Sequence, residues 1–343
     1  MTSLDNHPTI STDELCRSPE WFPADVDVAA RRIQFLHLDP QRLERAPFLD
    51  TRLDVDWRAG HVCSYEAVAL PPATRPAAWL WHTSFCGSTL LARMLHVAPH
   101  AVALKEPLVL RRLSDAAHAG SRIDEPLRVL LPLLSRPWHA EGRVLIKPTH
   151  AALNIARAVM AGDDRSRGIV LTSALEDFLI SNVKKPPATL GKVPQLVERA
   201  MGATRLLKKL GPAAFEPPST LAVVALQWAA QRELVSELLE AMGPERLRII
   251  DWADLQDDIT TSTLGCARWL DLGIPEAALR DSVAINASRH SKETEHHFDV
   301  ATRRSEASRL AETFEPQIRE AMAWAERHLL PAMSAGAIAV SGR

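Results

Sequence analysis

Residues 79–95 read WLWHTSFCGSTLLARML. The segment begins with apolar, β-prone residues, passes through small hydroxyl residues around Gly87, and continues with a helix-like pattern. This order is typical of a phosphate-binding loop, because the first N–H groups of a helix lack internal partners and carry partial positive charge. Gly87 would let an anion approach the backbone, and Ser88 and Thr89 offer hydroxyl donors. An ordinary buried strand and capped helix also fit, since the Walker A lysine is absent.

Length and composition are those of a globular protein. The chain has 343 residues, of which 46% are hydrophobic and 24% charged, and its net charge is −2. Such a near-neutral chain has no overall field that would draw it to nucleic acid, so no nucleic-acid partner is expected. The four cysteines are far apart, which argues against a zinc site and a disulfide framework. Without a signal-peptide pattern or an apolar run of ~18 residues, we expect a cytoplasmic protein without a membrane span.

Short apolar runs alternate with helical patterns from residue 77 onward. Such runs are typical of parallel strands that are covered on both faces. They cover residues 77–82, 101–104, 143–146, 168–171 and 247–250. The sequence therefore predicts an α/β fold with a P-loop-type parallel sheet flanked by helices on both faces. The expected organisation is an N-terminal extension over 1–76, a main domain over 77–330 with a proline-flanked basic insertion at 184–220, and a tail over 331–343.

Polar residues follow the predicted strands, at the edge where ligands bind in such sheets. Lys105 and Glu106 follow the second run, Lys147 the third, Ser173 the fourth and Asp251 the fifth. Because the carboxyl ends of parallel strands share one edge, we expect these side chains to converge beside the glycine loop. The convergence favours an anion site, although strand ends are often polar simply because they reach water.

Other segments carry structural signals. Residues 23–38 have a helical pattern, residues 60–70 alternate as a strand would, and residues 221–242 form an amphipathic helix. A closing helix is expected over 302–330, broken near Pro316. The insertion has seven Lys or Arg between residues 184 and 209 against one acid, which predicts either a basic lid over an anionic ligand or a solvated helix face. No metal is expected, because the late histidines lack a familiar zinc spacing; they are His290, His296 and His297.

With these residues in place, the chain resembles the sulfotransferases that use 3′-phosphoadenosine 5′-phosphosulfate (PAPS), in their bacterial branch with the P-loop fold. The matching segments are TSFCGSTLL at 83–91, LKEP at 104–107, VLTSALEDFLIS at 170–181 and IIDWADL at 249–255. The resemblance implies that PAPS is the donor and that the acceptor is a small molecule, glycan or lipid. It implies the cofactor-binding residues Cys86, Gly87, Ser88, Thr89, Leu90, Ser173, Ser181, Arg289 and Lys292.

Two cations of the family pattern are missing. Phe85 stands where the family's loop usually has Lys or Arg, and Ser173 stands where the 3′-phosphate site usually has Arg. We expect Lys147 to replace the loop cation, and Arg289 with Lys292 to replace the missing arginine.

Sulfuryl transfer asks a protein chiefly for positioning and charge stabilisation, as phosphoryl transfer does. Lys147 is predicted to stabilise the bridging oxygen as its bond breaks. Glu106 is predicted to take the acceptor's proton, with His82 and His150 as alternative bases. The alternative role for Glu106 is purely structural, as an acidic residue that interacts favourably with the positive end of the dipole of the following helix.

Two other functions stay open. A kinase-like protein with ATP and Mg²⁺ would need Asp251 or Asp254 as a metal ligand, and it lacks the Walker lysine. A non-catalytic nucleotide-binding or scaffold protein descended from the enzyme fold is favoured by the two missing cations.

Overall fold

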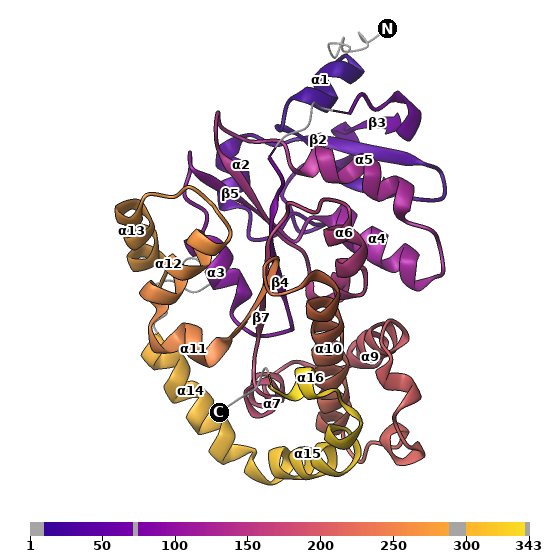
Figure 1. Cartoon of the computed structure of the whole chain (residues 1–343), viewed down its shortest axis with the longest axis vertical. Coiled ribbons are helices and arrows are strands. Elements are labelled where there is room, and N and C mark those ends of the chain that lie inside the picture. Colours follow the sequence, from indigo (N-terminus) through magenta and orange to yellow (C-terminus); the bar gives the residue numbers. More distant parts are fainter. Residues whose placement is uncertain (1–9, 71–74, 288–299, 340–343) are drawn as a thin grey trace, which may run out of the picture.

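The structure is a computed structural model that describes residues 10–70, 75–287 and 300–339. Its centre is a sheet of five parallel strands in the order β5-β6-β4-β7-β8 (Figure 1). The strands are β4 Ala78–His82, β5 Ala101–Lys105, β6 Arg143–Lys147, β7 Gly168–Thr172 and β8 Leu247–Asp251. Each strand lies within one residue of the apolar run that predicted it, so the predicted parallel sheet is confirmed.

Helices cover both faces of this sheet. Along β4, Leu80 packs into one hydrophobic cluster, while Trp79 and Trp81 pack into another on the opposite face. The Leu80 face is covered by α3 Ser88–Met94, α11 Trp252–Asp257, α12 Ile259–Trp269 and α13 Glu276–Ala287. The tryptophan face is covered by α4 Leu108–His118, α5 Asp124–Leu134 and α6 Ala156–Ala161.

The N-terminal region forms a second, antiparallel sheet that packs on α4 and α5. Its elements are α1 Thr12–Arg17, β1 Trp21–Asp27, β2 Arg32–His37, α2 Pro40–Arg45 and β3 His61–Ser64. The strand predicted over 60–70 is confirmed for residues 61–64, but the helix predicted over 23–38 is wrong. The chain reverses after β1, where Arg31 has a φ of 56°. The apolar residues that suggested one helix face therefore belong to two paired strands.

A buried arginine ties this region to the rest of the molecule. Arg136, which follows α5, donates to five backbone carbonyl groups at 2.7–3.0 Å, those of Leu15, Cys16, Ser18, Trp21 and Leu133. Since buried carbonyl oxygens require a donor, one guanidinium satisfies several positions of the N-terminal chain at once.

The insertion and the C-terminal helices form a third hydrophobic cluster, in the lower half of Figure 1. These helices are α7 Leu175–Val183, α8 Pro187–Leu190, α9 Val193–Gly202, α10 Thr220–Met242, α14 Val300–Thr313, α15 Glu315–His328 and α16 Ala335–Ala339. The helix predicted over 221–242 is confirmed as α10; Ser219 caps its start, and Gly243, with a φ of 77°, ends it. The predicted break near Pro316 is confirmed, because this proline stands in the first turn of α15. None of the helices in the described ranges has the length and apolarity that a bilayer crossing requires.

Candidate active site

A cavity of about 760 Å³ lies where the chain leaves β4, β5 and β6 at their carboxyl ends. It contains most of the site residues predicted from the sequence. The lining includes Cys86, Gly87, Ser88, Thr89, Glu106 and Ser181, with the alternative bases His82 and His150. Three other predicted site residues are buried and do not belong to the lining: Leu90, Lys147 and Ser173. Arg289 and Lys292 lie outside the described residues, and their role at the 3′-phosphate stays a prediction.

Gly87 is required at the turn of the loop for two reasons. Its φ of +75° lies in the left-handed region, and a Cβ placed there would lie 2.0 Å from ring carbon Cζ3 of Trp252. The indole of Trp252 is buried among the residues around α3 and does not line the cavity. Within the described residues, the backbone N–H groups of Gly87 and Thr89 donate no hydrogen bond. The loop therefore presents donors that an anionic oxygen can use.

The loop is supported from behind by two glutamines one turn apart on α10. Gln227 donates from its Nε2 to Ser84 Oγ at 3.1 Å, and Gln231 accepts from the Ser84 N–H at 3.2 Å. Both glutamines are buried. The sequence analysis missed them; the only signal was a pair of polar residues at a spacing of four on an otherwise apolar helix face.

Glu106 and Lys147 form a buried ion pair. Lys147 Nζ lies 2.7 Å from Glu106 Oε1, and the Lys147 side chain is 0% exposed against 16% for Glu106. Burial by itself would raise the pKa of Glu106, but the Lys147 ammonium, together with the nearby His150 and Arg52, outweighs burial and holds this pKa below its ordinary value. Glu106 is therefore ionised at neutral pH. The charge of Lys147 is neutralised by Glu106, and its predicted role as the loop cation stays a prediction.

The histidine beside this pair is held by backbone groups on both sides. The ring nitrogens of His82 lie 2.9 Å from the carbonyl oxygens of Thr83 and Pro148. Burial, and then the nearby charge of Lys147, holds the pKa of His82 well below its ordinary value. A neutral His82 has one N–H and can donate to only one of these carbonyl oxygens, while its other nitrogen faces the second carbonyl oxygen. Neither nitrogen is therefore well placed to take a proton from a ligand. His150, whose ring lies edge-on to His82 at 6.2 Å, also lines the cavity.

Positive charge reaches the cavity from the N-terminal region and from α4, which the sequence analysis had not placed beside the loop. It also comes from the basic insertion, for which a lid over an anionic ligand was one of the two predictions. At the start of the insertion, Lys185 Nζ lies 4.5 Å from the ring centroid of Phe85, the residue that stands in place of the expected loop cation. Among the described residues, five cationic side chains line the cavity against three carboxylates, so their summed charge is positive; the cations are Arg52, Arg111, Lys184, Lys185 and Lys192, and the acids are Asp50, Glu106 and Glu306.

The N-terminal region supplies one wall of the cavity, which the sequence analysis did not foresee. The N–H of Leu49 donates to the carbonyl oxygen of Lys105, and the N–H of Leu108 donates to that of Leu49. These bonds fix residues 46–52 along the end of β5. Arg52 is thereby placed over the ring of Phe48, at 3.7 Å from its centroid, and 3.6 Å from Glu106 Oε2.

The carboxylates of the kinase-like alternative do not line this cavity. Asp251 accepts from the N–H of Ala253 and so caps α11, and burial raises its pKa. Among the described residues, no group of three or more His, Cys, Asp or Glu is arranged to hold a metal ion.

No family model matches this sequence, and no curated protein matches it either. Among solved structures, the chain is similar to a sulfotransferase from Alicyclobacillus acidocaldarius, with 14% identity and a TM-score of 0.39 over 76% of this chain and 99% of that one. It is similar to the sulfotransferase domain of the Synechococcus PCC 7002 olefin synthase, with 14% identity and a TM-score of 0.38 over 80% of this chain and 96% of that one. It is also similar to the sulfotransferase domain of the curacin biosynthetic pathway, with 13% identity and a TM-score of 0.33 over 71% of this chain and 99% of that one. These likenesses decide neither the donor nor the acceptor of this chain.

Proposed function

We propose that this chain is a sulfotransferase-like enzyme that moves a sulfuryl group from PAPS to a hydroxyl or amine acceptor. One observation carries the proposal: a glycine loop with unused N–H donors opens into a cavity in which cations outnumber carboxylates. A nucleotide with phosphate groups at its 3′ and 5′ positions requires both features, because its anionic groups need donors and compensating charge.

The loop amides at residues 87–89 would hold the 5′-phosphosulfate. We propose Lys185 as the loop cation in place of the predicted Lys147, because Lys185 lies over Phe85 and lines the cavity, whereas Lys147 does not line it. Ser181 and Lys184, from α7 and the residue after it, would face the 3′-phosphate.

In the reaction, the acceptor oxygen or nitrogen forms a bond to sulfur while the bond from sulfur to the bridging oxygen breaks. Bound PAPS supplies the sulfuryl group, and adenosine 3′,5′-bisphosphate leaves. Glu106, already ionised, takes the acceptor's proton at Oε2, because Lys147 holds Oε1 at 2.7 Å while Arg52 lies farther from Oε2, at 3.6 Å. Lys147 keeps the carboxylate in place and stabilises the charge that develops beside it.

Calorimetry and thermal shift with adenosine 3′,5′-bisphosphate, with Mg·ATP, and with neither ligand test the donor assignment. Stabilisation by the bisphosphate alone is the expected result. Stabilisation by Mg·ATP alone would support the kinase-like alternative, and no response to either would support a non-catalytic protein.

A pair of variants tests the cation. Lys185→Ala should weaken bisphosphate binding about 10–100-fold, the value of one charge-assisted hydrogen bond. Lys208→Ala is the matched control, since Lys208 is an exposed lysine of the same insertion that does not line the cavity. Equal affinities in the two variants would exclude Lys185 as the loop cation.

A further inference from the structure

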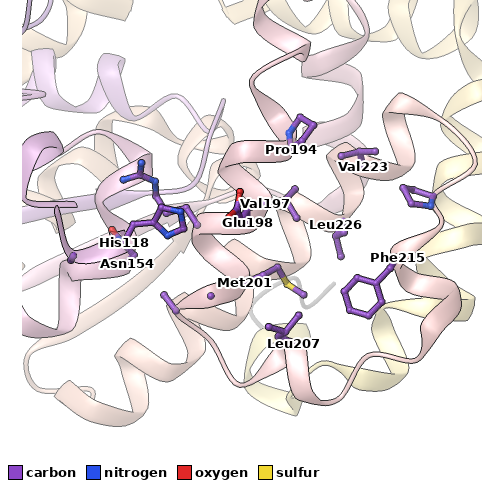
Figure 2. A pocket seen from close by; sticks show the side chains of 15 residues that line it. His118, Asn154, Pro194, Val197, Glu198, Met201, Leu207, Phe215, Val223 and Leu226 are labelled. Atoms are coloured by element: carbon purple, nitrogen blue, oxygen red, sulfur yellow. The ribbon is translucent and has the colours of Figure 1, made fainter. Parts of the chain in front are cut away.

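Two further cavities lie apart from the cavity proposed to hold PAPS (the donor cavity), and their charges differ. One, of about 760 Å³, lies between α9, α10 and the end of α4 (Figure 2). Among the described residues, its lining is largely apolar and holds one carboxylate, Glu198, and one guanidinium, Arg199. The other cavity, of about 420 Å³, has four arginines in its lining against one acid. Charge therefore distinguishes this second cavity, the arginine pocket, as a site for an anion.

The arginine pocket lies at the opposite end of the central sheet from the donor cavity. Its arginines are Arg75, Arg143, Arg165 and Arg167, and its acid is Asp271. These arginines stand at the start of β6 or within three residues before β4 and β7, and β6, β4 and β7 are parallel neighbours. The pocket shares no lining residue with the donor cavity. Strands of five residues separate the two sites by roughly 15 Å.

The segment before β7 is held in place by a further arginine. Arg246 donates to the carbonyl oxygens of Met160, Asp163 and Ser166 at 2.6–3.3 Å. These bonds fix the chain that leads to the two arginines before β7. The first of them, Arg165, pairs with the carboxylate of Asp163 at 3.1 Å. The pocket is therefore built on a fixed part of the fold.

Arg143 is the most buried of the four arginines, with 12% of its side chain exposed. It donates from Nε to the carbonyl oxygen of Asp271 at 2.7 Å and from Nη2 to Asp271 Oδ2 at 2.9 Å. Burial lowers the pKa of Arg143 below its ordinary value; the Asp271 carboxylate opposes this shift, and the charge of Arg75 adds to it. The guanidinium groups of Arg75 and Arg143 therefore repel one another, and an anion bound between them would relieve that repulsion.

The positive charge of the pocket is only partly compensated. Arg167 donates from Nη1 to the carbonyl oxygen of Trp269 at 3.3 Å, and within the described part of the chain no carboxylate pairs with it. Arg75 lies 3.5 Å from Glu141, but their side chains are 65% and 87% exposed. Because such exposed ion pairs stabilise a protein little, an anion can compete for these guanidinium groups.

The lining favours two linked phosphate groups over a single anion. The planar fork of a guanidinium matches the oxygens of a phosphate. Four guanidinium groups and one carboxylate give the described lining a summed charge of +3, and two phosphate groups carry roughly −3 to −4. Neighbouring strands lie about 4.8 Å apart, so arginines from three strands span roughly 10 Å, farther than one phosphate reaches. The cavity also has the size of a small-molecule site.

We propose that the arginine pocket binds a compact anion with two linked phosphate groups, either free pyrophosphate or the diphosphate of a nucleotide. Arg75, Arg143 and Arg167 supply the donors, from the segments that carry them at the amino edge of the sheet. This site goes beyond the proposed function and does not depend on it, because it shares no residue with the donor cavity.

The test is isothermal titration calorimetry of the full chain with pyrophosphate, inorganic phosphate and metal-free ADP. Arg75→Gln and Arg167→Gln each remove one exposed guanidinium and should weaken pyrophosphate binding at least about tenfold, as for a lost charge-assisted hydrogen bond. Arg128→Gln is the matched control, because Arg128 is an exposed arginine of α5 that lines none of these cavities. Lys185→Ala, in the donor cavity, should leave pyrophosphate binding unchanged.

Four results would overturn the inference. They are the absence of pyrophosphate binding, pyrophosphate binding that ignores both arginine variants, pyrophosphate binding that is lost in Lys185→Ala, and inorganic phosphate binding as tight as that of pyrophosphate. A duplex oligonucleotide that binds more tightly than pyrophosphate, and that Arg128→Gln weakens as much as Arg167→Gln, would also overturn it, since the surface would then attract any polyanion. Of the supporting results, equal affinities for ADP and pyrophosphate indicate recognition of the diphosphate alone, and tighter binding of ADP indicates a nucleotide.

Binding of adenosine 3′,5′-bisphosphate to the same variants separates this inference from the proposed function. The arginine variants should leave bisphosphate affinity unchanged. Bisphosphate binding without pyrophosphate binding refutes the arginine pocket and leaves the donor assignment intact. Pyrophosphate binding that the arginine variants weaken, in a protein that does not respond to the bisphosphate, supports the pocket and refutes the donor assignment.

Discussion

Replacing Gly87 by alanine tests the geometry of the loop directly. The substitution forces a Cβ into the left-handed region, which costs roughly 1–2 kcal/mol. It also places that Cβ 2.0 Å from the indole of Trp252, and relief of such overpacking costs about 1–3 kcal/mol more. The free energy of unfolding should therefore fall by about 2–5 kcal/mol, as measured by urea denaturation.

Two other glycines separate these contributions. Gly120 also has a positive φ, +85°, but no atom of the described residues lies within 4 Å of a Cβ built on it. Gly120→Ala should therefore show only the backbone contribution of about 1–2 kcal/mol. Gly202 lies at the end of α9 without a positive φ and with open space around it, so Gly202→Ala should leave stability unchanged or raise it slightly.

Bisphosphate binding adds a readout that a purely structural change elsewhere would not move. Gly87→Ala shifts the loop amides and should weaken binding, whereas Gly120→Ala should not. If Gly87→Ala destabilised the protein no more than Gly120→Ala, the indole would not be the obstacle inferred here. If it left stability unchanged, the left-handed turn itself would be refuted.

Three further predictions follow from buried charges. Glu106→Gln should reduce sulfuryl transfer ~10²–10⁴-fold with bisphosphate affinity nearly intact, and should destabilise the fold by about 3–5 kcal/mol because Lys147 loses its partner; unchanged turnover would exclude Glu106 as the base. Burial lowers the pKa of Lys105 from 10.5 to about 8, so between these pH values the unfolded chain binds more protons than the folded one. The free energy of unfolding should therefore rise from pH 8 to 10.5 by at most about 1.4 kcal/mol per pH unit. Lys105→Met should remove this rise in denaturation curves, and a rise that persists in the variant would show that Lys105 is not its source. Arg136→Met should lower the free energy of unfolding by at least about 3 kcal/mol, because several buried carbonyl groups lose their hydrogen-bond donor at about 1–3 kcal/mol each. A smaller loss in urea denaturation would indicate that water replaces the guanidinium.

The central sheet could be predicted from the sequence because its signals are local. A parallel strand covered on both faces is a short apolar run, and the five runs end within one residue of the observed strands. The rule that parallel strands share a carboxyl edge predicted that the residues after the strands would converge beside the glycine loop. Glu106 and His150 do line the cavity there, whereas Lys105, Lys147, Ser173 and Asp251 do not. The N-terminal hairpin was missed because the left-handed turn at Arg31 has no strong turn sequence and the flanking residues mimic a helix face.

The parts of the site that sequence reasoning missed depend on contacts between distant segments. Arg52 reaches the cavity only because Leu49 bonds to the end of β5, and no local pattern encodes that bond. Lys185 belongs to the basic insertion that was predicted as a possible lid, but its position over Phe85 was not predicted, because that position depends on how α7 packs against the loop. The ion pair of Lys147 with Glu106 was not predicted either, although both residues were, because the sequence gives no direction for a side chain.

The glutamine support of the loop also has a consequence for biosynthesis. Ser84 and Gln231 are 147 positions apart, so the ribosome completes the loop long before it makes the helix that braces it. At roughly 5–20 residues per second, the delay is about 7–30 s. During translation the nascent chain would therefore carry its anion loop unbraced, and ligand recognition would arise only once α10 has emerged from the exit tunnel.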